Sequence, residues 1–263
     1  MPIWLSYILL YLIAIAVILI ALTIHELGHF TCAVIFKINI KELSIGIGPR
    51  LFSWHSKKGI KYSLKLFPIM AYVLMDSHAS RELYKDFRED FKYYYYMKPI
   101  SKDKILLEDS KLWQYSLTML MGIICNIAIF LIAWLILFLC GVNLNPFISL
   151  GQTFVTIGYN MAFLPSPYGG NIFTELAKID PNSFSVANWA LIFFNLFLML
   201  NLMLAVLNIL PIPPLDGYKM LSRQYVVISK KKISEKFESS LSLFFMLLMM
   251  YILVSSIIVG IIN

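Results

Sequence analysis

Charged residues are scarce in this 263-residue chain. Asp, Glu, Lys and Arg make up 14% of it, whereas 59% is hydrophobic, and the mean hydropathy is +0.76. This balance excludes an ordinary soluble domain and indicates a membrane protein. Cysteine is also rare: Cys32, Cys125 and Cys140 lie in apolar runs without CxxC spacing, and we interpret them as buried small apolar residues.

The N-terminus lacks the basic segment of a signal peptide, and its apolar run is too long for one. We therefore expect this first hydrophobic segment to be retained. The net charge of +7 is explained by loops that face anionic lipid, so we expect the lipid bilayer and no nucleic acid as a partner.

Four segments are long enough to cross a hydrocarbon core of about 30 Å, which takes about 20 apolar residues. They are residues 3–36, 112–140, 186–210 and 241–262. The predicted fold class is an all-α polytopic membrane protein with four transmembrane helices. We expect residues 1–263 to form a single membrane-embedded domain.

The distribution of basic residues predicts the topology. Of the 22 Lys and Arg, fifteen lie in residues 37–111 and six in residues 219–236, which places both loops in the cytoplasm by the positive-inside bias. We therefore expect a multi-pass protein of the cell membrane with both termini outside and an outer interfacial segment at 141–185. The Ile-, Lys- and Asn-rich composition favours a bacterial source.

The motif HELGH interrupts the first apolar run with three ionisable groups. Because a four-residue step on an α-helix turns about 40° beyond a full circle, His25 and His29 share one face and can bind one metal ion. Zinc with an open coordination position lowers the pKa of its bound water to about 7, and Glu26 is placed to take the proton.

A chance match, or histidines that only pair with neighbouring helices, would explain the same letters. An ionisable residue at membrane depth costs about 2.5–3.5 kcal/mol on insertion scales, which favours a functional reading. Three such groups within five positions need a shared partner, and a metal ion is the most economical one.

Zinc then needs another protein ligand, and Asp216 in NILPIPPLDG is the best candidate. The prolines of this stretch prevent an ordinary helix, and Gly217 permits close approach of the backbone. In the predicted topology Asp216 and the two histidines lie toward the same face of the membrane. The alternative is an aspartate in a water-exposed turn at the end of a helix.

The combination of HELGH in the first span with NILPIPPLDG far downstream resembles the site-2 protease family of intramembrane zinc metalloproteases, in a compact form. The resemblance implies Zn²⁺ as cofactor, His25, His29 and Asp216 as metal ligands, and Glu26 as general base. The segments between the predicted spans are too short for a PDZ domain, so we expect none in this chain.

Two asparagines also correspond to family positions. MGIICN, residues 121–126, is similar to an AGPxxN stretch of the family, with Gly122 and Asn126 kept and the alanine and proline lost. The resemblance implies that Asn126 and Asn208 bind the substrate backbone or the oxyanion. The alternative for each is a hydrogen bond between helices.

A small membrane-associated β-hairpin is expected after the first helix, within the cytoplasmic loop 37–111. From Ile60 to Leu66 apolar residues alternate with Lys61, Ser63 and Lys65, the period of a half-buried strand, and residues 57–59 suit a turn. The family has a β-element here, and its edge could hold an unwound substrate by strand addition. A hairpin that only covers the cytoplasmic face is the alternative.

Residues 80–111 are expected to form a cytoplasmic helix, with Tyr93 to Tyr96 at the lipid boundary, or a plain linker. His55 and His78 are expected at the surface.

The predicted function is that of a zinc endopeptidase cutting within membrane-spanning segments of single-pass proteins or signal-peptide remnants. A membrane transporter of protons or metal ions could use the same polar residues. It is disfavoured by the absence of inverted repeats. A scaffold that binds membrane segments without cutting them is a further alternative, which the intact HELGH and Asp216 disfavour.

Overall fold

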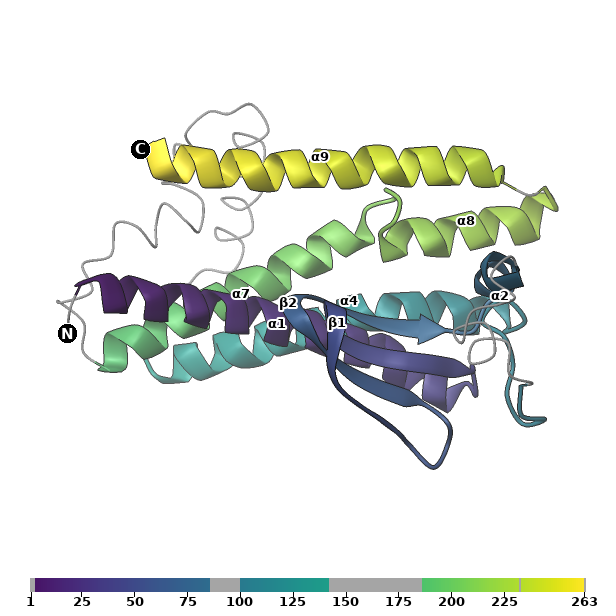
Figure 1. Cartoon of the computed structure of the whole chain (residues 1–263), viewed down its shortest axis with the longest axis horizontal. Helices are drawn as coiled ribbons and strands as arrows, with labels where there is room; N and C mark the ends of the chain where they lie inside the picture. Colours follow the sequence, from purple (N-terminus) through teal and green to yellow (C-terminus); the bar gives the residue numbers. More distant parts are fainter. Residues whose placement is uncertain (1–2, 86–99, 142–185, 232, 263) are drawn as a thin grey trace. The chain divides into compact units, whose positions relative to one another are not determined.

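The computed structural model describes residues 3–85, 100–141, 186–231 and 233–262. These contain the helices α1 (Ile3–Ile35), α2 (His78–Lys85), α4 (Leu112–Leu139), α7 (Val186–Ile209), α8 (Asp216–Ser229) and α9 (Glu235–Ile262), and the strands β1 (Ile40–His55) and β2 (Lys61–Met75) (Figure 1). The predicted outer segment from residue 142 onward and the run Tyr93 to Tyr96 lie outside the described residues.

Helices occupy all four segments predicted to span the membrane. Two stretches, Leu12–Ile35 and Leu112–Leu139, are long and apolar enough to cross a bilayer by length and composition. The described part of α7 contributes a shorter apolar stretch, Leu196–Ile209. The total of four crossings and the outside position of both termini stay predictions.

By their contacts the residues divide into two compact units. The first comprises residues 1–21, 126–219 and 232–263. In its core the early part of α1 packs against α7 through Ala14, Val17, Ala21, Leu196 and Leu200. A second cluster joins the later part of α4 to α7 through Phe130, Ala133, Leu137 and Leu198. Helix α7 therefore has apolar contacts with two different helices, as expected for a helix that is hydrophobic all round.

The second unit comprises residues 22–125 and 220–231. Its core cluster joins the end of α1 to the start of each strand through Ala33, Ile38, Ile40 and Ile60. Helices α1 and α4 approach closely at Gly28, where a Cβ would lie 2.5 Å from the carbonyl oxygen of Met121. Only glycine permits this separation, so Gly28 sets how near the two helices lie.

The predicted β-hairpin is confirmed, and its strands are longer than expected. The N–H of Ser56 donates to the Ile60 carbonyl at 2.9 Å across the turn, and Gly59 supplies the positive φ of +79°. Both strands bend, so Glu42 pairs with Leu74 on one side and with Lys61 on the other. Figure 1 shows the bent strands.

The alternation in β2 has the expected period but the opposite orientation. Lys61 and Ser63 are buried, whereas Leu64 and Leu66 are 43% and 47% exposed. Leu51, Phe52, Trp54, Phe67 and Met70 are exposed as well. The later part of β1 and the early part of β2 therefore bury polar groups and expose apolar ones, the kind of patch that marks a membrane or partner contact. This surface is the one we expect to meet lipid.

A buried aspartate joins both strands to α2. Asp76 is 1% exposed, and its two carboxylate oxygens accept hydrogen bonds from the Arg81 guanidinium at 2.9 and 2.7 Å. Lys41 lies at 3.0 Å from the same carboxylate, and the Asn39 amide donates to it at 2.8 Å. Because charged hydrogen bonds are roughly twice as strong as neutral ones, this cluster holds the start of β1 against the end of β2.

The remaining sequence predictions have mixed outcomes. His55 is exposed and the His78 side chain is 62% exposed beside Asp109, which confirms both as surface residues. Cys32 is buried and Cys125 is only partly buried. Cys140 is exposed just past the end of α4, so its interpretation as a buried residue was wrong. The position of a cysteine within an apolar run does not show whether neighbouring helices extend far enough to cover its side chain. Of the helix predicted over residues 80–111, residues 80–85 are confirmed as part of α2, residues 100–111 are not helical, and the residues between them lie outside the described ones.

Candidate metal centre

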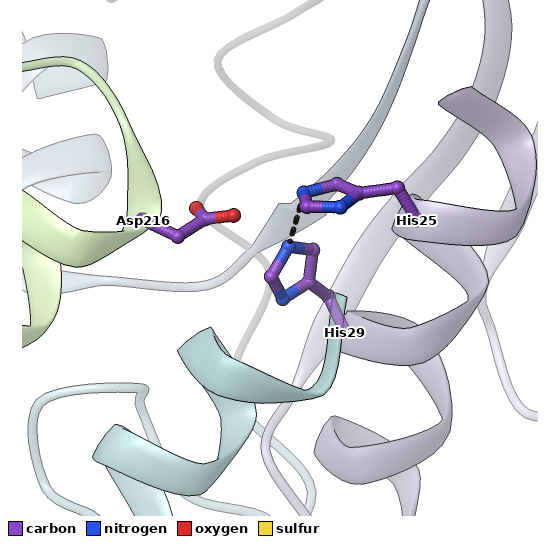
Figure 2. A group of neighbouring side chains, drawn as sticks. All are labelled: His25, His29 and Asp216. Atoms are coloured by element: carbon purple, nitrogen blue, oxygen red, sulfur yellow. Dashed lines mark hydrogen bonds between the residues drawn. The ribbon is translucent and has the colours of Figure 1, made fainter. Parts of the chain in front are cut away.

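Two buried histidines face each other on α1. His25 and His29 are each 4% exposed, and their rings meet edge to face with centroids 4.7 Å apart. Their Nε2 atoms lie 3.1 Å apart, as the dashed line in Figure 2 marks. Two nitrogens bound to one tetrahedral zinc at about 2.0–2.1 Å would be separated by about 3.3 Å. The spacing of the pair therefore suits zinc with almost no rearrangement.

The orientation of His29 is set from α4. Its Nδ1 lies 2.7 Å from the carbonyl oxygen of Thr118, and a carbonyl can only accept, so Nδ1 carries the proton. The lone pair is then on Nε2, the atom that faces His25. Metal-binding histidines are commonly held in this way through their second ring nitrogen. A backbone carbonyl leaves no trace in the sequence, so this contact could not be predicted.

A glycine on α4 makes room for the two imidazole rings. A Cβ at Gly122 would lie 2.5 Å from Nε2 of His29 and 2.7 Å from Cε1 of His25. Real Cβ atoms do not approach other atoms so closely, so any larger residue would displace both rings. The sequence identified Gly122 only by resemblance, and the structure shows its physical role.

Glu26 lies between the two histidines in sequence and points to the sheet. Its carboxylate accepts a hydrogen bond from the backbone N–H of Val73 on β2 at 2.9 Å. Glu26 is partly buried, and this contact connects the α1 turn of HELGH with the β-element predicted to bind substrate. Val73 itself was not identified from the sequence, because a main-chain donor depends on the path of the strand.

Asp216 is the first residue of α8. It is 4% exposed, so it is not the water-exposed turn aspartate considered as the alternative. Its carboxylate accepts a hydrogen bond from the Lys219 ammonium at 3.0 Å. At Gly217 a Cβ would collide with the carbonyl oxygens of Ile209 and Leu210, which confirms that glycine is needed for close approach.

The three predicted metal ligands are all buried. His25 and His29 belong to the second unit, and Asp216 belongs to the first. Two imidazoles and a carboxylate are a donor set that zinc accepts, with a further position open. The residues therefore fit the ion, although their assignment as ligands remains a proposal.

The two asparagines are in the predicted helices. Asn126 is fully buried on α4, and Asn208 is half-buried near the end of α7, where its amide donates to the Leu204 carbonyl at 3.0 Å. This local bond partly satisfies Asn208 within its own helix. Their contact with substrate stays a prediction.

A second buried polar cluster lies within the sheet. Glu42 is 2% exposed, accepts hydrogen bonds from the hydroxyls of Ser63 and Tyr72, and has the ammonium groups of Lys61 and Lys65 at 3.7 and 3.9 Å. Burial alone would raise the pKa of Glu42, but the Ser63 hydroxyl and the two lysines outweigh it and lower the pKa below its usual value. The carboxylate therefore stays ionised inside the sheet.

Comparison with known proteins supports a zinc metalloprotease. The family described as "Peptidase family M50" matches residues 13–252. A Fusobacterium nucleatum protein named "Putative zinc metalloprotease" is 44% identical over 63 residues, 24% of this chain and 18% of its own length. The "Probable protease eep" of Enterococcus faecalis is 42% identical over 52 residues, 20% of this chain and 12% of its own.

The metalloprotease MmpA of Caulobacter vibrioides is 37% identical over 54 residues, 20% of this chain and 14% of its own length. The aligned stretches therefore span less than a fifth of each of these three relatives.

Proposed function

Because the chain belongs to peptidase family M50, we propose that it is a zinc-dependent endopeptidase of the cell membrane. Its substrates are the membrane-spanning segments of single-pass proteins or the remnants of signal peptides, which it cuts within the apolar segment. The resemblance to the site-2 protease family, drawn from HELGH and NILPIPPLDG, is confirmed by this family match.

The observation that carries the proposal is the histidine pair. His25 and His29 present Nε2 to Nε2 at 3.1 Å inside an apolar helix, and the contact with Thr118 fixes the tautomer of His29. The two Nε2 atoms are close enough to bind one ion, and a cation would replace the proton that they share. Asp216 would add the negatively charged ligand.

A zinc ion held by His25, His29 and Asp216 would polarise the scissile carbonyl and lower the pKa of water at the site. Glu26, one residue from His25, takes the proton from that water and passes it to the leaving amine. Its contact with the Val73 N–H holds the carboxylate at a defined position before substrate arrives. General-base assistance of this kind contributes about 10²–10⁴-fold in rate.

The sheet supplies a place for an unwound substrate. The N–H of Val73 donates to Glu26, so this edge of β2 faces the α1 turn that carries the histidines. An extended segment could add to that edge through main-chain hydrogen bonds. Asn126 and Asn208 would bind the substrate backbone or the developing oxyanion.

Cleavage by the full chain in proteoliposomes tests the proposal. A fluorescent single-pass peptide is the substrate, and mass spectrometry locates the cut. We expect cleavage inside the apolar segment, loss of cleavage after zinc is removed with a chelator, and recovery on adding zinc. Cleavage only in the water-exposed flanks, or cleavage that survives chelation, would contradict the proposal.

Zinc content tests the ligand assignment. Asp216→Ala should lower the stoichiometric zinc of the purified protein, as His29→Ala should, because each removes one donor. Asp109→Ala is the matched control, since Asp109 is 51% exposed and pairs only with the surface His78 among its described contacts. Full zinc retention in Asp216→Ala would show that Asp216 is not a ligand.

A further inference from the structure

A cavity lies where α1 ends and the sheet begins. Its volume is about 580 Å³, and the residues that line it come from residues 34–41 and 57–60 and from the loop at residues 101–104. Small-molecule sites in proteins have volumes of about 300–1,000 Å³. The cavity is therefore large enough for a small polar ligand, and all of its lining belongs to the second unit.

The lining is strongly basic. Five lysines contribute to it, Lys37, Lys41, Lys57, Lys58 and Lys104, against a single carboxylate, Asp103. Lys41 is balanced by Asp76 at 3.0 Å, which leaves four ammonium groups and one carboxylate. The carboxylate of Asp103 already accepts a hydrogen bond from the Ser101 hydroxyl. With Asp103 counted, these four lysines leave a net charge of +3 on the lining, so the ammonium groups repel one another unless a further anion joins them.

The backbone brings these lysines together in three ways. Lys37 has the unusual positive φ of 59° just after α1, which reverses the chain and lets the Ile38 N–H donate to the Ala33 carbonyl at 2.8 Å. Lys57 and Lys58 are in the β1–β2 turn. Lys104 arrives on the segment whose Ile105 N–H donates to the Lys37 carbonyl at 3.0 Å.

The position of the cavity suggests what kind of anion reaches it. Val34, on the last turn of the apolar α1, is part of the lining together with Lys37. The residues that follow an apolar span lie at the depth of the lipid headgroups, and basic pockets at this depth bind anionic headgroups. Inorganic phosphate offers the same oxygens from solution.

We propose that this cavity is a phosphate-binding site, in which Lys37, Lys57, Lys58 and Lys104 surround the phosphate of an anionic headgroup or a free phosphate ion. Lysine recognises phosphate as a point charge. The site therefore selects a ligand by its negative charge and by its position at the membrane surface more than by the shape of the headgroup. The site is separate from the metal ligands in residues and in chemistry.

Thermal unfolding of the full chain in a neutral detergent tests the site at constant ionic strength. The probes are dihexanoyl phosphatidylglycerol, dihexanoyl phosphatidylcholine and inorganic phosphate. We expect the midpoint to rise with phosphatidylglycerol and not with phosphatidylcholine. A matching rise with inorganic phosphate would identify a free-ion site, and a rise with phosphatidylglycerol alone would identify a headgroup site.

Charge-matched variants separate a built site from general attraction. The combined change Lys57→Gln, Lys58→Gln and Lys104→Gln should weaken the apparent Kd at least tenfold. The change Lys102→Gln, Lys230→Gln and Lys231→Gln removes equal charge from three exposed lysines outside the lining, and it should alter the Kd less than twofold.

Asp103→Asn removes the only carboxylate of the lining and should tighten binding severalfold. No midpoint shift of the unmodified protein with either anionic probe would overturn the proposal. So would equal weakening by the two triple variants, since that result would show attraction by net charge alone.

Discussion

Two buried polar clusters of the second unit differ in how far the chain itself satisfies their polar groups. In the sheet, Glu42 is surrounded by two ammonium groups and two hydroxyls, so its negative charge is matched by neighbours in the chain. On α1, two imidazoles place their Nε2 atoms against each other, and the described hydrogen bond of His29 to Thr118 uses only the opposite ring nitrogen.

The difference separates structural from chemical roles. A buried ion pair whose members satisfy each other is costly to break but has nothing left to offer a ligand. The histidine pair differs, because its two Nε2 atoms share one hydrogen bond and both can become ligands when a cation replaces the proton between them. A buried polar group can therefore be structural or a candidate ligand, and the partners that it has in the chain distinguish the two roles.

Matched glutamate substitutions should give the largest contrast. Glu26→Gln is expected to reduce the cleavage rate by about 10²–10⁴-fold, because an amide cannot accept the proton, while zinc content and thermal stability stay unchanged. Glu42→Gln should lower stability but leave the rate per folded molecule within about twofold. Rates, zinc content and melting are measured on the same preparations, and normal cleavage by the Glu26 variant would remove its role as base.

Asp76→Asn should be the most destabilising change outside the metal centre. It leaves Arg81 and Lys41 without their carboxylate, and breaking a buried pair costs about 3–5 kcal/mol; we expect about 3, because the Arg81 side chain is 21% exposed. Asp109→Asn, in the exposed pair with His78, should cost at most about 1 kcal/mol. Equal losses in thermal or denaturant unfolding would contradict this contrast.

Gly122→Ala tests how tightly α4 holds the imidazoles. The added methyl overlaps His29 and His25, so the rings must turn, and we expect a 10–100-fold loss of zinc affinity in competition with a chelator, as for the loss of a contact that orients a ligand. Ile124→Ala is the control on the same helix, since Ile124 is 44% exposed. Unchanged affinity in the glycine variant would show that the rings have room to move.

The smallest expected effect is on the pH dependence of stability. Burial by itself raises the pKa of Asp76, but the hydrogen bonds from Arg81, Asn39 and Lys41 outweigh it and lower the pKa below its usual range. The unfolded chain then binds the proton first, near pH 3.9. The stabilisation is complete above that pH and is lost as the pH falls through the folded pKa.

Melting curves between pH 7 and pH 3 check this prediction. The difference in stability between the unmodified protein and Asp76→Asn should be constant near neutrality and should shrink below about pH 4. A difference that stays constant down to pH 3 would show that the carboxylate contributes no linked ionisation.

The residues of the candidate metal centre could be identified from the sequence because the patterns that mark them are local or distinctive. The four-residue spacing of His25 and His29 needs only helix geometry, and Asp216 is marked by the prolines before it and the glycine after it. The hairpin was predicted from its period of two. The missed features, the Thr118 carbonyl and the Val73 N–H, belong to the backbone, whose groups are the same at every position.

The faces of the hairpin show where prediction from pattern ends. Alternation in β2 shows that one face differs from the other, and it does so whether lysines or leucines are inside. The Ser63 hydroxyl on β2 donates a hydrogen bond to Glu42 on β1, so this polar face is buried. The opposite face, with Leu64 and Leu66, is exposed. The alternation alone does not tell which face is buried. That was decided by the contact between Ser63 and Glu42, which are 21 positions apart.

The order of residues is enough to specify apolar helices and a histidine pair on one helical face, and to mark Asp216 as the candidate third ligand, since each depends on spacing along one element. Folding alone settled which ring nitrogen carries a proton, how closely α4 approaches α1 and where the lysines gather. These depend on groups that become neighbours only when separate segments pack, and no single segment contains that information.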